Sequence, residues 1–201
     1  MSEPLVDFLD IMRRLRAECP WKAEQTHRSL ARYLLEETHE TIEALDTGDP
    51  DHLREELGDL LLQVYFHAVI AEESGDFTLD DVVRGITEKM LRRNPHVFGP
   101  PAVGVGGLDA AAVNDAWQEI KAAEKARDHV TDGLPPTLPA LLYADKVLDR
   151  LAREGAGPVL PSATGDDDLG DRLLALVAEA RTTERDPEQA LRDAVRRLLA
   201  R

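Results

Sequence analysis

Apolar residues recur at helical spacing through the first half of the chain. Leu5, Phe8 and Met12 lie on one face of a helix predicted over residues 4–18, which Cys19-Pro20 ends. A second helix is expected from a Thr26 cap to about residue 46, and a third over residues 51–74. Residues 47–50 read Thr-Gly-Asp-Pro, which is typical of a compact turn between antiparallel helices.

The same spacing predicts helices over residues 78–93, 109–128, 139–154, 168–181 and 187–201. The fourth helix is expected to turn four apolar side chains inward: Val82, Val83, Ile86 and Met90. Glycines and prolines predict a loop over residues 99–107 and a linker over residues 132–136. No segment shows a convincing strand pattern, so we predict an all-α helical bundle with a domain over residues 1–130 and a helical region over residues 131–201.

The composition of the chain excludes several classes of function. The 201 residues include 24 Lys and Arg against 39 Asp and Glu, a formal net charge of −15. Such an acidic chain argues against binding of nucleic acid or of anionic membranes through a basic face. Cys19 is the single cysteine, which excludes an internal disulfide framework, and the N-terminus does not resemble a signal peptide. We therefore expect a cytoplasmic protein.

Acidic residues are concentrated in the stretch that contains most of the second predicted helix and all of the third. Residues 33–83 hold fifteen Asp and Glu but a single Lys or Arg, Arg54. A solvated helix face usually mixes both signs and gains from pairs four residues apart. The absence of basic partners in this stretch indicates that a cation neutralises part of it.

Helical wheels bring four of these carboxylates toward one another. On the second helix, Glu37 lies inside the apolar stripe and Glu40 at its edge; the stripe consists of Leu30, Leu34, Thr41 and Ala44. On the third helix, Glu56 and Asp59 adjoin a stripe of Leu53, Leu57, Leu60 and Val64. The turn between the helices then lets the two carboxylate pairs face each other.

Facing carboxylates cannot all stay ionised without a partner, and hard cations take oxygen ligands. We therefore predict a magnesium site, with manganese as a substitute, at Glu37, Glu40, Glu56 and Asp59. Five other acids of this stretch are taken as surface residues: Glu43, Asp46, Glu55, Glu72 and Glu73. His39, His52 and His67 show no zinc-like spacing among themselves and are not assigned to a metal.

Basic and aromatic residues that suit a phosphorylated substrate follow the acidic stretch. Lys89 and Arg93 lie one helical turn apart, as do Trp117 and Lys121. The alternatives are a basic helix end that complements the helix dipole and a tryptophan that packs in the core. Two interpretations of Trp21 are left open: a core residue, or part of a lid over the site.

These residues carry a recognisable pattern. Glu36-Glu37-x-x-Glu40 followed by Glu56-x-x-Asp59 resembles the signature of the MazG nucleotide pyrophosphohydrolases. The ordered set around it is more specific and runs from about residue 5 to residue 125: Cys19-Pro20-Trp21, Gln25-Thr26-His27, Pro95-His96-Val97-Phe98 and residues 117–125. Two positions depart from the family, Lys22 in place of an acid and Asn94 in place of a histidine, which puts nucleotide choice in doubt.

The resemblance implies a catalytic domain over residues 1–130 that dimerises and hydrolyses nucleoside triphosphates, ribo or deoxy, between the α- and β-phosphates, with a role in sanitising the nucleotide pool. It implies Glu37, Glu40, Glu56 and Asp59 as magnesium ligands and Lys89, Arg93, Trp117 and Lys121 as nucleotide contacts. Glu36 is expected to orient or deprotonate the attacking water. The alternatives are a phosphoribosyl-ATP pyrophosphatase and a non-catalytic acidic helical regulator.

The C-terminal region echoes the signature faintly. Residues 167–171 read Asp-Asp-Leu-Gly-Asp, as residues 55–59 read Glu-Glu-Leu-Gly-Asp. No Glu-Glu-x-x-Glu precedes this echo, so Asp168 and Asp171 lack facing carboxylates, and Arg150 and Arg172 are expected to neutralise them. We therefore predict a degenerate and truncated second repeat with no chemistry of its own.

Overall fold

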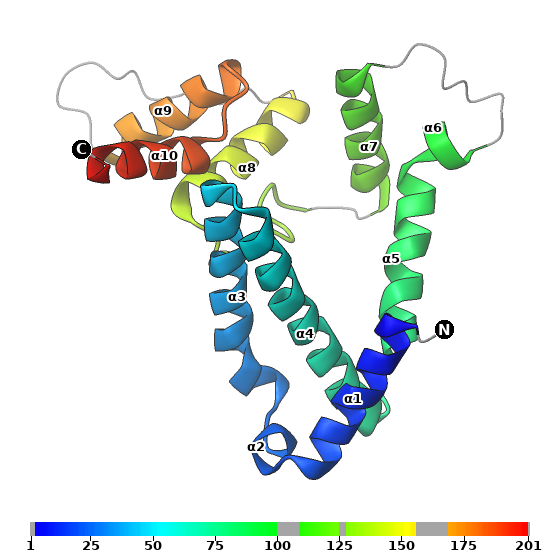
Figure 1. Ribbon diagram of the computed structural model, residues 1–201. Coiled ribbons are helices and arrows are strands. Elements are labelled where there is room, and N and C mark those ends of the chain that lie inside the picture. The colour runs from blue at the N-terminus through cyan, green and yellow to red at the C-terminus, as the bar shows by residue number, and fades with distance from the viewer. Residues whose placement is uncertain (1–2, 100–108, 125–127, 156–168, 201) are drawn as a thin grey trace. The chain divides into compact units, whose positions relative to one another are not determined.

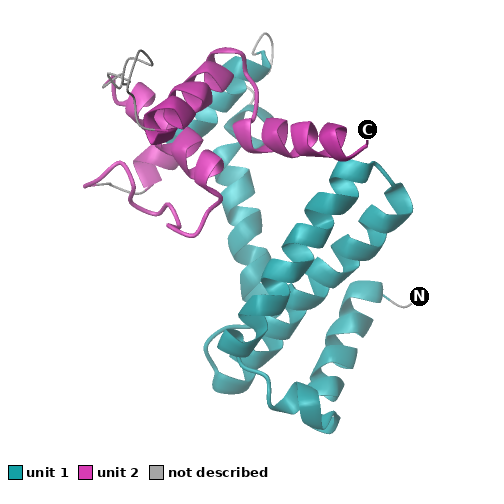
Figure 2. Ribbon diagram, turned by 90° about the vertical axis from the view of Figure 1, so that its left-hand side faces the viewer, with its two compact units in different colours: residues 1–120 teal, residues 121–201 magenta. Residues whose placement is uncertain are grey.

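The computed structural model describes residues 3–99, 109–124, 128–155 and 169–200, and every regular element within these ranges is an α-helix (Figure 1). The all-α fold is therefore as predicted. Most of the loop expected over residues 99–107 lies outside the described residues. In the described ranges, no helix is both long enough and apolar enough to cross a membrane. The chain forms two compact units, Met1–Ile120 and Lys121–Arg201 (Figure 2).

The first unit is built around a helical hairpin. Helix α3 (His27–Thr47) begins at Thr26, whose side chain accepts from the Ser29 backbone in a capping box. It ends at Gly48, which adopts a left-handed φ of 73° that favours glycine. Asp49 then caps α4 (Pro50–Ser74), and Figure 1 shows α3 and α4 as an antiparallel pair. This turn chemistry is what the sequence predicts.

Helix α1 (Pro4–Glu18) packs against the C-terminal half of α4. The core joins seven buried residues: Met12, Leu30, Tyr65, Phe66, Ala68, Val69 and Leu79. The Tyr65 hydroxyl donates to the Leu5 carbonyl at 3.1 Å. Two ion pairs fasten the same helices, Arg13 with Glu72 at 2.8 Å and Arg16 with Glu73 at 2.5 Å. The hairpin that carries the acidic residues is thus held by α1.

Four further helices complete the described elements of this unit. Helix α5 (Leu79–Arg93) starts with a Thr78–Asp81 capping box and packs on α4. Asn94 ends it as expected, but Pro95 starts a one-turn helix, α6 (Pro95–Phe98), that the sequence pattern does not predict. Helix α2 (Pro20–Ala23) is a second unpredicted turn, again with proline in its first position. Helix α7 (Ala110–Glu124) follows and reaches across the boundary between the two units.

Two of the expected apolar stripes are wrong. On α4, Leu57 is 50% exposed and Val64 41% exposed, whereas Glu56 and Gln63 are buried. On α5, the four residues expected inward are all substantially exposed: Val82, Val83, Ile86 and Met90. Apolar residues lie on several sides of both helices, so periodicity alone cannot choose the buried side. The helices packed on α4 decide it, and an apolar surface of the chain stays uncovered.

The second unit is a three-helix arrangement of α8 (Ala140–Arg153), α9 (Leu169–Thr182) and α10 (Pro187–Leu199), which contact one another pairwise. Leu148 and Val177 are its buried apolar residues. Arg181 of α9 bridges Asp145 and Asp149 of α8 at 2.8 and 3.0 Å. Arg150, expected to neutralise the echo motif, donates to the carbonyl oxygens of Val130 and Asp132, and its expected pairing stays a prediction. Asp168 lies outside the described residues.

Candidate metal and nucleotide site

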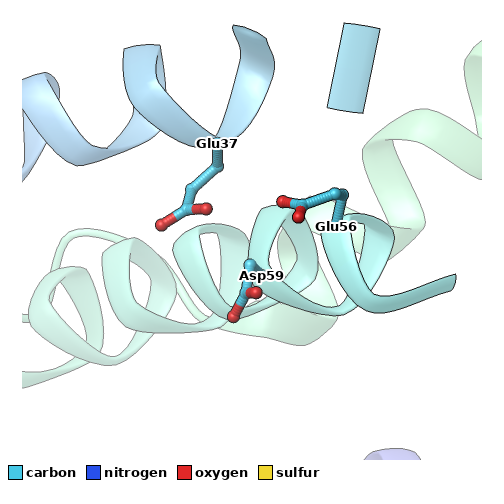
Figure 3. A group of neighbouring side chains, drawn as sticks. All are labelled: Glu37, Glu56 and Asp59. Carbon is cyan, nitrogen blue, oxygen red and sulfur yellow. The ribbon is translucent and has the colours of Figure 1, made fainter. Parts of the chain in front are cut away.

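Three carboxylates converge between α3 and α4. Glu37 extends from α3 toward α4, where Glu56 and Asp59 lie on successive turns (Figure 3). One oxygen atom from each lies within 4.8 Å of the other two. The hairpin turn produces this meeting because it sets the inward sides of two antiparallel helices against each other.

The cluster is electrostatically strained without a cation. The pKa of Glu37 is raised above its ordinary value. Partial burial is the largest cause, and the negative charge of Asp59 is the second largest. The charge of Glu40, a hydrogen bond with its carboxyl group and the charge of Glu56 raise this pKa further. A bound divalent cation would remove this penalty by favouring the ionised form of Glu37.

Glu56 has the geometry of a metal ligand that a neighbouring histidine holds in position. Its side chain is 11% exposed, and its Oε1 is 3.1 Å from Nε2 of His52, one turn earlier on α4. The other oxygen, Oε2, is buried with no hydrogen-bond partner in the described chain. A buried carboxylate oxygen without a partner is costly, and a hard cation satisfies it. The three residues therefore fit a magnesium-like ion.

The remaining two acids of the signature lie outside this group of three. Glu40 is exposed and reaches the cluster through its interaction with Glu37. Glu36 is also exposed and forms an ion pair of 3.5 Å with Arg32. The assignments of Glu40 as a ligand and of Glu36 as the catalytic residue stay predictions.

The structure brings together two of the four expected nucleotide contacts. The Arg93 guanidinium at the end of α5 lies 5.1 Å from the ring centroid of Trp117 on α7, a cation–π contact. Lys121 lies one turn further along α7 and Lys89 one turn before Arg93, both partly exposed. Trp21 is half-exposed and meets Tyr33 edge-on, with ring centroids 6.0 Å apart. Its position favours neither a core role nor a lid.

Sequence reasoning missed two histidine contacts. His52 supports Glu56, and the spacing of four residues on one helix was a readable signal for that pair. His27 and His67 also meet, with their Nδ1 atoms 2.7 Å apart. No spacing rule could have paired these two, because forty residues separate them.

The fold and the cluster define a class: an all-α protein with a carboxylate site suited to a hard divalent cation. Comparison with known proteins narrows this class. The model of the MazG nucleotide pyrophosphohydrolase domain matches residues 25–98. A nucleoside triphosphate pyrophosphohydrolase/pyrophosphatase MazG from Thermotoga maritima is 36% identical over 219 residues, which cover 97% of this chain and 82% of that protein.

A nucleoside triphosphate pyrophosphohydrolase from Mycobacterium tuberculosis is 41% identical over 186 residues, 92% of this chain but 54% of that longer protein. The crystal structure of a mazG-related protein from Thermotoga maritima aligns at a TM-score of 0.48 with 26% identity, covering 56% of this chain and 95% of that one. The chain belongs to the MazG family of nucleotide pyrophosphohydrolases and is an enzyme of the hydrolase class.

Proposed function

We propose that this protein hydrolyses nucleoside triphosphates between the α- and β-phosphates, releasing the nucleoside monophosphate and pyrophosphate, with magnesium as its cofactor. The observation that supports this most directly is the converging group of Glu37, Glu56 and Asp59 with its unpartnered buried oxygen. The names of the relatives from Thermotoga maritima and Mycobacterium tuberculosis support the substrate class.

In this proposal the carboxylates bind the cofactor. Glu37, Glu56 and Asp59, with Glu40 at the edge, would bind magnesium, which supplies charge neutralisation at the phosphates and a more acidic bound water. His52 keeps the Glu56 carboxylate oriented through Oε1 and leaves the buried Oε2 available to a cation. Glu36, ion-paired with Arg32 on the exposed side of α3, orients or deprotonates the attacking water.

The basic and aromatic residues of α5 and α7 bind the substrate. Lys89 and Arg93 contact phosphate oxygens, since guanidinium and ammonium groups are the usual phosphate partners. Trp117 stacks on the nucleobase and Lys121 reaches a further phosphate. The Arg93–Trp117 contact supports this assignment because it gathers a phosphate-binding group and a base-stacking ring in one place.

We propose further that the protein is a homodimer. Leu57, Leu61 and Val64 form an exposed apolar stripe on α4, at spacings of four and three residues. Leu34 and Leu45 add exposed apolar surface on α3. A second copy packed on the hairpin would cover this surface. It would also explain why Leu57 and Val64, which the sequence pattern predicts to be buried, are exposed in the single chain.

A phosphoribosyl-ATP substrate is less favoured, because the compared relatives carry the nucleoside triphosphate name. A role in sanitising the nucleotide pool and a cytoplasmic location stay part of this proposal. The second unit is proposed to be a degenerate repeat because of the echo at residues 167–171. Arg181 pairs with two of its acids, Asp145 and Asp149.

The test is product identification on a panel of nucleotides. Ribo-, deoxyribo- and oxidised nucleoside triphosphates are incubated with the protein and magnesium, and products are separated by anion exchange. Monophosphate and pyrophosphate in equal amounts are expected. Diphosphate with inorganic phosphate would show cleavage at the other anhydride, and turnover in the presence of a chelator would refute metal dependence.

A further inference from the structure

The two histidines at the far end of the α3–α4 hairpin form an unusual contact. His27 occupies the first position of α3, and His67 lies in the C-terminal half of α4. Their Nδ1 atoms are 2.7 Å apart, their ring centroids 5.0 Å apart, and their planes differ by 2°. The centroid separation exceeds the N···N distance by roughly two ring radii, so the rings lie end to end in one plane.

This geometry requires a single proton between the two rings. Two N–H groups at this distance would collide, and two lone pairs would repel each other, whereas one N–H aimed at one in-plane lone pair is a good hydrogen bond. A metal ion fits poorly here, because opposed coplanar lone pairs at 2.7 Å leave no room for two metal–nitrogen bonds of about 2.0–2.1 Å each.

The outer nitrogen atoms decide which ring donates. His67 Nε2 is buried with no hydrogen-bond partner in the described chain, whereas His27 is exposed to water. A buried N–H without an acceptor costs more than a buried lone pair, so the proton of His67 belongs on Nδ1. His67 therefore donates from Nδ1 to Nδ1 of His27, and His27 keeps its own proton on Nε2.

Burial disfavours a positive charge on His67. Burial, and then the charge of His27, lower the pKa of the His67 imidazole below its ordinary value. Among the described residues, two cations of the packed helices lie over the ring of Phe66, which precedes His67 in the chain: Arg16 of α1 and Lys22 of α2. The nearest acids on α4, Glu72 and Glu73, are engaged by Arg13 and Arg16. These described groups add no free negative charge that would favour a second proton on His67.

We propose that His27 and His67 form a one-proton clasp that fixes the register of α3 against α4, and that both are positioning residues for the carboxylate cluster. Because α3 and α4 are antiparallel, each contributes one residue to the histidine contact and at least one to the carboxylate cluster. Going from Glu37 to His27 moves ten residues along α3, about 15 Å, and going from Asp59 to His67 moves eight along α4, about 12 Å. A slip at the clasp therefore displaces Glu37 from Asp59. The positioning half of this proposal rests on the proposed metal site.

The clasp itself is tested by nitrogen NMR on the full-length protein at pH 8. Long-range ¹⁵N–¹H spectra should show His67 protonated at Nδ1 and bare at Nε2, the less common tautomer, and His27 the reverse. On acidification His67 should stay neutral below pH 6.5, the ordinary pKa of a histidine side chain. His67 protonated at Nε2, or becoming charged at or above pH 6.5, would overturn the clasp whatever the protein catalyses.

The positioning role is tested by manganese binding measured by electron paramagnetic resonance. Asparagine carries its amide atoms at the same branch point as Nδ1, so the double variant His27→Asn, His67→Asn can keep a neutral hydrogen bond. His27→Ala should weaken Mn²⁺ binding by about 2- to 12-fold, the range of one ordinary hydrogen bond. The double variant should restore it, and His39→Asn on the same helix should leave it unchanged.

The pH profile separates positioning from a general structural role. Below the pH at which the NMR spectra show a second proton on the pair, the wild-type Mn²⁺ affinity should fall more steeply than that of the double asparagine variant. The second proton breaks the clasp in the wild type, whereas the cluster carboxylates are the same in both proteins. Parallel profiles, or unchanged affinity in His27→Ala, would overturn the positioning role. No Mn²⁺ binding in any variant would refute it together with the proposed function, while the NMR result still decides the clasp.

Discussion

Removing one charge from the carboxylate cluster should stabilise the apoprotein and abolish its response to metal. In Glu37→Gln, two of the three mutual repulsions disappear. Two unit charges 4.8 Å apart repel by about 0.9 kcal/mol at the dielectric constant of water, and by about 3.5 kcal/mol at an effective value of 20. The cluster is partly open to solvent, so the lower figure applies and two repulsions amount to about 2 kcal/mol.

The assay is thermal unfolding at pH 7.5, with a chelator and then with magnesium. A gain of about 2 kcal/mol raises the Tm of a chain of this size by roughly 4–8 °C. Magnesium at a hundred times its dissociation constant should stabilise the wild type by about 2.7 kcal/mol and should leave Glu37→Gln unchanged. Turnover should fall by at least about a thousandfold, since charge neutralisation by a metal is worth several kcal/mol.

The pH dependence follows from the raised pKa of Glu37. A carboxyl group whose pKa is higher in the folded than in the unfolded chain favours folding at low pH, and this contribution is lost as pH rises through the folded value. The stability advantage of Glu37→Gln should therefore vanish below about pH 4.5, the ordinary value, and grow above it. Glu55→Gln, which removes an exposed charge beside Glu56, is the control. Equal Tm shifts in the two variants would refute the reasoning.

Three further predictions follow from the other assigned residues. Lys89→Ala should cost about 2–4 kcal/mol of transition-state stabilisation in kcat/KM if the ammonium contacts a phosphate, whereas Arg84→Ala on the same helix should change little; similar small losses would favour a helix-dipole role for both. Leu61→Glu should convert the proposed dimer to a monomer in light scattering at micromolar concentration, and a wild-type protein that is already monomeric and fully active would contradict the dimer. Asp168→Asn with Asp171→Asn should leave turnover unchanged, and lost catalysis in a folded double variant would show that the second unit holds a working site.

Much of this protein is determined locally, and the sequence alone predicts that part. Thr26, Gly48 and Asp49 place the ends of α3 and α4 because capping depends on a few neighbouring residues. Once a short turn joins two helices, their inward sides must face each other. Helical wheels and that turn predicted that Glu37 faces Glu56 and Asp59, and these three carboxylates do meet, although two residues of the α4 stripe used for the wheel, Leu57 and Val64, are exposed.

The tertiary structure alone decided which side of each long helix is buried and which distant residues meet. Apolar residues lie all round α4, so the choice of Gln63 and Phe66 over Leu57 and Val64 was made by the helices that pack on it. Likewise, His67 finds His27 only because α3 and α4 stop sliding at one register. Periodicity fixes angles around a helix axis, but the depth of burial at each angle depends on which neighbour excludes water there.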